Sequence, residues 1–125
     1  MSYAVGEQFQ SFIASTDMRS HQFKIVDMTT TFGKIDLAAA LKAYGVVANN
    51  PNAGEFAQVV TEGETLVQVG AAVSVGDYIT SAATGFGAAT TSSVDQLILG
   101  RVTAAAASGM YATVKLRVQR VGPIA

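Results

Sequence analysis

Side chains that could perform acid–base or nucleophilic chemistry are few and scattered in this chain. His21 is the one histidine, and no serine or acid near it has the spacing of a catalytic set. Ser74 lies in Ala-Val-Ser-Val-Gly, but the first glycine of a nucleophile elbow is missing and a strand follows instead of a helix. Glu62 and Glu64 are a close acid pair. A catalytic dyad or a calcium site is conceivable there, but a solvated turn is favoured because oxygen-ligand sites usually need more acids.

Patterns for cofactors, metals and nucleic acids are equally sparse. Cysteine is absent, which excludes thiolate nucleophiles, disulfides and cysteine metal sites. The segment Gly85-Phe-Gly87-Ala-Ala-Thr90 contains part of a dinucleotide-binding fingerprint, but no helix follows, so we interpret it as a turn. Four bases near the C-terminus, beside an acidic middle and without clustered aromatics, disfavour nucleic-acid binding. We therefore expect no catalysis, no cofactor, no metal and no nucleic-acid partner.

Charged residues are few, and they are segregated along the chain. They make up 14% of the sequence, against about 25% in an ordinary soluble domain. Residues 43–100 contain acids and no base, whereas residues 101–125 contain bases and no acid. Either acidic and basic strands pair within one sheet, or opposite charges meet between copies or on a partner. A surface with so few charges favours a subunit with neighbours over a free monomer.

Short valine- and threonine-rich segments separated by glycine and asparagine turns predict an all-β barrel or sandwich. Two expected strands, 56–61 and 65–69, are separated by a turn at Glu62-Gly63-Glu64. The clearest hairpin joins 97–103 to 110–118 through a turn of small residues. In its second strand, alternation predicts that Val114, Leu116 and Val118 face inward while Thr113, Lys115, Arg117 and Gln119 face outward.

One segment has a helical pattern, and one has no clear periodicity. Asp36–Tyr44 is the helical candidate, because Asp36 can cap its start and Gly45 can end it. Residues 1–20 are expected to form an extended N-terminal arm, and residues 21–125 a single β domain. The start of the chain lacks the basic-then-apolar pattern of a secretory signal, and no apolar run approaches the ~20 residues of a membrane helix. We therefore expect a soluble protein that is not exported and has no membrane partner.

Several glycine- and valine-rich motifs follow one another in order within residues 21–118. They are the turn Gly45-Val-Val-Ala-Asn-Asn-Pro-Asn-Ala-Gly-Glu55, the segments Gly63-Glu-Thr-Leu-Val-Gln-Val69 and Ala71-Ala-Val-Ser-Val-Gly-Asp77, the tip Thr84-Gly85, and the closing hairpin from Leu99-Gly-Arg-Val102 to Leu116. Each motif alone is weak, because glycine turns and valine strands are common. Their order resembles that of the small capsid decoration (cement) proteins of tailed bacteriophages.

The resemblance implies a structural role without catalysis. Such proteins lie on the outer face of an icosahedral head, commonly as trimers at or near threefold positions, and tie neighbouring major capsid subunits together. The implied partners are the major capsid protein and sister copies in a homo-oligomer, with a trimer favoured. The implied location is the outer capsid surface of the virion, after synthesis in the cytoplasm of the host bacterium. The expected fold is all-β, a small β-barrel or sandwich (β-tulip-like), with the extended arm and at most one short helix.

Two alternatives compete with this hypothesis. The first is another phage tail or virion structural component, since short β-modules of this kind also occur there. The second is a small enzyme or a carbohydrate-binding module, although the chain has no tryptophan and its aromatic residues are dispersed.

The candidate residues for contact with the capsid or a sister subunit form two groups. The first consists of apolar residues of the arm, for which core packing is an equal alternative: Tyr3, Phe9, Phe12 and Ile13. The second consists of C-terminal bases that would meet the acidic middle of another copy: Arg101, Lys115, Arg117 and Arg120.

Overall fold

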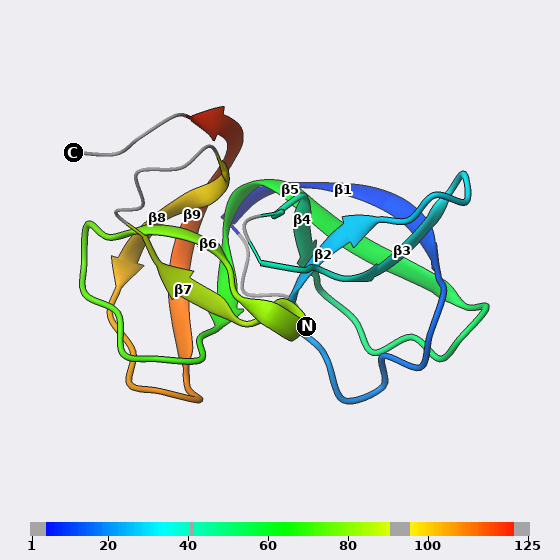
Figure 1. Cartoon of the computed structure of the whole chain (residues 1–125), viewed down its shortest axis with the longest axis horizontal. Coiled ribbons are helices and arrows are strands. Elements are labelled where there is room, and N and C mark those ends of the chain that lie inside the picture. The colour runs from blue at the N-terminus through cyan, green and yellow to red at the C-terminus, as the bar shows by residue number, and fades with distance from the viewer. Residues whose placement is uncertain (1–4, 41, 91–95, 122–125) are drawn as a thin grey trace.

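Nine β-strands form one sheet in this computed structural model, which describes residues 5–40, 42–90 and 96–121 and the side chains of residues 10–40, 42–90 and 97–117. The strands are β1 (Val5–Ala14), β2 (Ile25–Met28), β3 (Lys34–Leu37), β4 (Gly45–Val47), β5 (Phe56–Gln68), β6 (Tyr78–Ser81), β7 (Gly87–Ala89), β8 (Gln96–Ala104) and β9 (Tyr111–Val121). The helical content of these residues is one 3₁₀ turn, η1 (Ala83–Gly85). The all-β fold class is therefore confirmed (Figure 1).

The N-terminal half closes into a five-stranded barrel, which is one of the two all-β architectures that the sequence predicts for the β domain. Its strands follow the order β1-β3-β2-β4-β5, and β1 pairs back onto β5, with Ile13 opposite Phe56. The β1–β3 pair is parallel and the others are antiparallel. Each of these five strands therefore has a neighbour on both sides, which closes the barrel and protects its backbone hydrogen-bonding groups.

Strand β5 is shared between the barrel and the second half of the molecule (Figure 1). Its first part pairs with β4 and β1, and its second part pairs with β9, which is followed in the sheet by β8, β6 and β7. Just beyond β5, Val69 forms a parallel bridge with Gly87 of β7. The last strand of the second half in sheet order, β7, therefore curls back toward the end of β5.

The turn expected at Glu62-Gly63-Glu64 is wrong, because β5 runs through these residues without a break. Gly63 has a φ of +96°, a left-handed conformation that residues with side chains rarely adopt. The register with β1 also shifts on both sides of Gln8, which lies opposite Glu62. The glycine therefore bends the strand where it leaves the barrel and joins β9.

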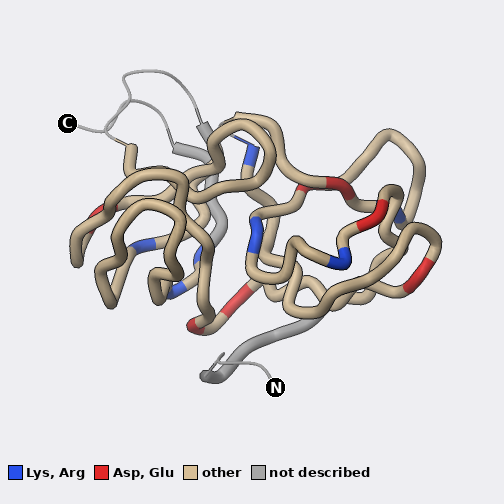
Figure 2. Tube along the Cα trace, turned by 90° about the horizontal axis from the view of Figure 1, so that it is seen from below, with Lys and Arg blue, Asp and Glu red and all other residues tan. Residues whose placement is uncertain are grey.

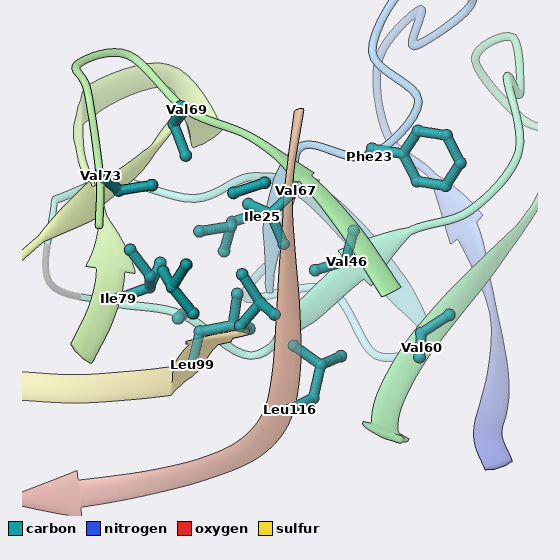
Figure 3. Close-up of a cluster of buried hydrophobic side chains, with 14 of the residues drawn as sticks. Phe23, Ile25, Val46, Val60, Val67, Val69, Val73, Ile79, Leu99 and Leu116 are labelled. Atoms are coloured by element: carbon teal, nitrogen blue, oxygen red, sulfur yellow. The ribbon is translucent and has the colours of Figure 1, made fainter. Parts of the chain in front are cut away.

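Buried side chains form two clusters on opposite faces of the shared strands. Val59 belongs to the cluster inside the barrel, whereas its neighbour Val60 belongs to the cluster between the barrel and the second half. Figure 3 shows the second cluster, in which Ile25 of β2 lies beside Val67 of β5. Ile79 and Leu99 extend the same cluster into the second half. The two halves thus share a continuous apolar core.

The helix expected at Asp36–Tyr44 is wrong. Asp36 lies inside β3, and its carboxylate accepts hydrogen bonds from the Leu37 backbone N–H at 2.7 Å and from Thr16 Oγ1 at 2.9 Å. Ala38 and Ala43 are both buried in the core. Packing of these two alanines in the core outweighs the local helix propensity.

The N-terminal segment is extended from Val5 to Ala14, where it forms β1. This strand is part of the barrel, because it pairs with both β3 and β5 of its own chain. The role of residues 1–20 as a contact arm stays a prediction.

Candidate interaction surface

Strand β9 presents two cations on the outer face of the second half. Val114 and Leu116 are buried, whereas Lys115 and Arg117 between and beyond them are exposed. Adjacent residues of a strand point to opposite faces of the sheet, so burial of the valine and leucine forces the cations outward. The alternation predicted for residues 113–117 is confirmed. Val118 and Gln119 lie outside the described side chains.

The strand register places acids and bases side by side. Glu64 of β5 lies opposite Lys115, and Lys115 lies opposite Arg101 of β8. One strand further, Arg101 lies opposite Tyr78 of β6. A second acid, Glu62, lies in the same way opposite Arg117, so the acidic and basic strands are neighbours within one sheet. Figure 2 shows how sparse charged positions are along the rest of the trace.

We call the charged residues that lie side by side on β5, β9 and β8 the charged row: Glu62, Glu64, Lys115, Arg117 and Arg101. Its members differ in how fully their polar groups are hydrogen-bonded. Glu64 accepts a hydrogen bond from Thr103 Oγ1 at 2.8 Å. Arg101 donates through Nε to the Gly76 carbonyl at 3.1 Å, and its guanidinium carbon lies 5.0 Å from the centre of the Tyr78 ring.

Lys115 and Arg117 are the unpaired cations of the row. Within the described part of the chain, neither side chain forms a hydrogen bond or ion pair, and the one ion pair there is Arg19–Asp17 at 2.8 Å. Both side chains are exposed. Side chains in this state are available to an anionic or polar partner.

Two open grooves lie beside these cations. The larger, of about 540 Å³, extends from Lys115 and Arg117 to Gln10 and Tyr44 at the rim of the barrel. The Tyr44 hydroxyl donates a hydrogen bond to Gln10 Oε1, which joins the two side chains at that rim. The smaller groove, of about 230 Å³, extends from the same two cations toward Tyr78. We call these the barrel-side groove and the β6–β8 groove.

The residues predicted for the arm have different positions. Phe12 is half-buried and packs edge-on against Tyr44, with ring centres 5.7 Å apart, beside the barrel core. Ile13 lies on the outer face, between Lys34 of β3 and Phe56 of β5. Tyr3 lies outside the described residues, and so do the side chains of Phe9 and Arg120, although the backbones of these two belong to β1 and β9.

The residues considered for catalysis are not brought together. His21 Nδ1 lies 3.1 Å from Lys24 Nζ, and the backbone N–H of Ser74 donates to Asp77 Oδ2 at 2.9 Å. Glu62 and Glu64 lie in the charged row instead of on an isolated turn. Among the described residues, no group of three or more His, Asp or Glu side chains is placed to hold a metal ion. No helix in those residues is long and apolar enough to cross a membrane.

Sequence reasoning found the cations of this surface but missed its aromatic and amide members. Tyr44, Gln10 and Tyr78 come from three other parts of the chain, and only the strand order brings them beside β9. No sequence pattern marks that order. Ammonium and guanidinium donors flanked by aromatic rings are suited to recognising carboxylates and rings, through hydrogen bonds and cation–π contacts.

Comparison with known proteins shows a likeness in fold. No protein-family model matches the sequence, and no curated protein matches it. A solved structure, the crystal structure of the head fiber gp8.5 N base in bacteriophage phi29, superposes with a TM-score of 0.71. The match covers 89% of this chain and 94% of that chain, at 17% sequence identity. At this identity the likeness establishes a common fold.

Proposed function

We propose that this protein is a structural component of a bacteriophage virion, which decorates the outer surface of an icosahedral capsid and stabilises it by bridging major capsid subunits. The observation that carries the proposal is the fold likeness to a phage head fiber base over nearly the full length of both chains. The order of motifs from Gly45 to Leu116, which resembles the decoration proteins, supports the same conclusion.

The chemistry of the described surface fits binding better than catalysis. Lys115 and Arg117 are exposed and unpaired among the described residues, and the grooves beside them are open to solvent. We infer a homo-oligomer, with a trimer favoured, whose copies meet each other and the major capsid protein through surfaces of this kind. Many copies with modest interfaces would stabilise a shell by mass action and multivalency.

A second candidate function is a component of a projecting virion appendage. It is favoured by the printed description of the similar structure, which is the N base of a head fiber. The two functions differ in copy number and position. A decoration protein covers the shell at many symmetry-related positions, whereas an appendage base occupies only the sites from which its fibers project.

An add-back experiment tests the proposal. Heads that lack this protein should assemble but break at lower temperature or on chelation, and purified protein should bind them and restore their stability. A variant with the opposed charges Lys115→Glu and Arg117→Glu should restore less, whereas Arg19→Gln, which changes a cation outside the grooves, should act like the wild type. Absence of any binding of wild-type protein to the heads would contradict the proposal.

A further inference from the structure

The hairpin between β2 and β3 carries a fully exposed aromatic side chain. Phe32 has 101% of its reference surface exposed to solvent, the largest value among the described large apolar residues. Single exposed apolar side chains are common on protein surfaces, but burying an aromatic ring that is fully in water would be favourable. The position is therefore a candidate for insertion into a partner.

The tip that presents Phe32 is held by local hydrogen bonds. Thr29 Oγ1 donates to the Thr31 carbonyl and accepts from the Thr31 backbone N–H, both at 3.1 Å. The Thr29 N–H donates to the Lys34 carbonyl at 3.0 Å, and the Lys34 N–H donates to the Thr31 carbonyl at 3.2 Å. An aromatic side chain on such a braced turn loses little conformational freedom when it binds.

The β6–β8 groove has the composition to receive an aromatic ring. Its described lining combines Ile98 and Gly100, which are both buried, with the exposed Tyr78 and the exposed cations Arg101, Lys115 and Arg117. Arg101 already stacks over Tyr78, so a guanidinium and an aromatic ring form one wall. An entering ring would gain apolar contact and a cation–π contact from the same wall.

The hairpin carries two acids and one base, Lys34, so its net charge is opposite in sign to that of the groove. Asp27 and Asp36 lie directly opposite each other on β2 and β3, an arrangement in which like charges repel. Lys115 and Arg117 at the groove are unpaired within the described residues. Placing the two carboxylates near these cations would relieve the repulsion and pair the cations.

We propose that Phe32 of one copy inserts into the β6–β8 groove of a second copy of this chain. The hairpin and the groove belong to opposite ends of the molecule (Figure 1), so Phe32 does not reach the groove of its own chain. The contact joins two different surfaces and is therefore head-to-tail, which closes into a ring when the rotation permits. The inference rests on the homo-oligomer of the proposed function and names the surfaces that form it.

The test measures molar mass in solution for the full chain, by sedimentation or light scattering at about 100 µM, a concentration that detects weak association. Wild type should be larger than a monomer. Phe32→Ser, which removes the inserted ring, and the double variant Lys115→Glu with Arg117→Glu, which alters the groove, should each be monomeric. The control Met110→Ser removes another exposed apolar turn residue, 56% exposed and outside both surfaces, and should stay like wild type. Unchanged circular dichroism confirms that each variant is folded.

Mixing the two monomeric variants distinguishes a head-to-tail contact from other contacts. Phe32→Ser retains the groove and the charge variant retains Phe32, so an equimolar mixture should form dimers and nothing larger. A monomeric wild type, an oligomer that survives Phe32→Ser, or a mixture that stays monomeric would overturn the inference. The last two results include the case in which Phe32 contacts a capsid protein instead. Wild type that is monomeric yet binds heads contradicts this inference and the homo-oligomer but leaves capsid binding intact, whereas a head-to-tail oligomer that binds no heads contradicts capsid binding alone.

Discussion

Gly100 of β8 lies opposite Leu116 of β9 beside a register shift, and a side chain there would meet the backbone of β9. A Cβ added at Gly100 would lie 2.0 Å from the Lys115 carbonyl oxygen. We expect Gly100→Ala to lower the free energy of unfolding by about 2–3 kcal/mol through overpacking, measured by urea denaturation. Gly109→Ala separates the clash from backbone strain, because Gly109 has a φ of +79° but open space around it. Its cost should be about 1 kcal/mol, and equal losses in the two variants would contradict the close approach of β8 and β9.

Thr65 has a buried hydroxyl with no hydrogen-bond partner in the described part of the chain. Removing an unpaired buried polar group is favourable, so Thr65→Val should raise the free energy of unfolding by about 1 kcal/mol. The matched control is Thr80, which is also buried but donates to the Leu97 carbonyl at 2.7 Å. Thr80→Val should lower the same free energy by about 1 kcal/mol. A loss of stability in both variants would show that the Thr65 hydroxyl is paired in solution.

Asp17 titrates at an unusually low pH because of Arg19. Hydrogen bonds from the Arg19 side chain and backbone lower the pKa of Asp17 from 3.8 to about 2. The stabilising effect of this pair is therefore present above pH 3.8 and is lost as the pH falls through about 2. A carboxyl-detected NMR titration should find the low pKa in wild type and a value closer to 3.8 in Arg19→Gln. The same pKa in both proteins would rule out Arg19 as the cause.

At the scale of elements, residue patterns predict strands correctly where buried and exposed side chains alternate. They predict the wrong structure where packing against distant parts of the chain determines the conformation. The β8–β9 hairpin is confirmed, with strand ends that differ from the prediction by one to three residues, because Val114 and Leu116 alternate with exposed cations. Helix propensity at Asp36–Tyr44 is overridden by strand pairing of Asp36 and by burial of Ala38 and Ala43 in the core. The Glu-Gly-Glu motif has the composition of a turn, yet Gly63 only bends β5.

Pairing between distant strands explains why the candidate surface was found only in part. Alternation within β9 predicts that Lys115 and Arg117 face outward, and charge segregation predicts that acids lie near them or on another copy. The neighbours Tyr78 and Tyr44 depend on β6 pairing with β8 and on β1 closing the barrel. These are long-range register choices, for which local residue patterns carry no signal.

The charged row on β5, β9 and β8 gives a prediction for how elements associate between copies. Reversing Arg117 to Glu should weaken self-association more at about 20 mM salt than at about 500 mM, because exposed charge pairs are screened. Arg19→Glu is the matched reversal at a site outside both grooves, and should change association little at either salt. The measurement is the dissociation constant by sedimentation equilibrium. Equal weakening by Arg117→Glu at both salt concentrations would assign its effect to packing.

At the scale of the whole molecule, the scarcity of charge is accompanied by a sheet that leaves few backbone groups unpaired. The barrel closes its own edges, and the second half curls toward β5, so most backbone groups of the sheet are already paired. The surfaces left for partners are side-chain surfaces: the cationic grooves at one end and Phe32 at the other. We therefore expect assembly by contacts between side chains, and not by addition of strands to an open edge.

The central proposal is that the protein is a structural component on the outside of a phage head, and imaging of the virion tests it most directly. In a cryo-electron microscopy reconstruction, we expect densities of the size and shape of the β1–β9 fold on the outer head surface, at many symmetry-related positions and bridging neighbouring major capsid subunits. A virion that lacks the protein should lack these densities. Density confined to the tail or the head interior, or absence of the protein from wild-type virions, would contradict the proposal.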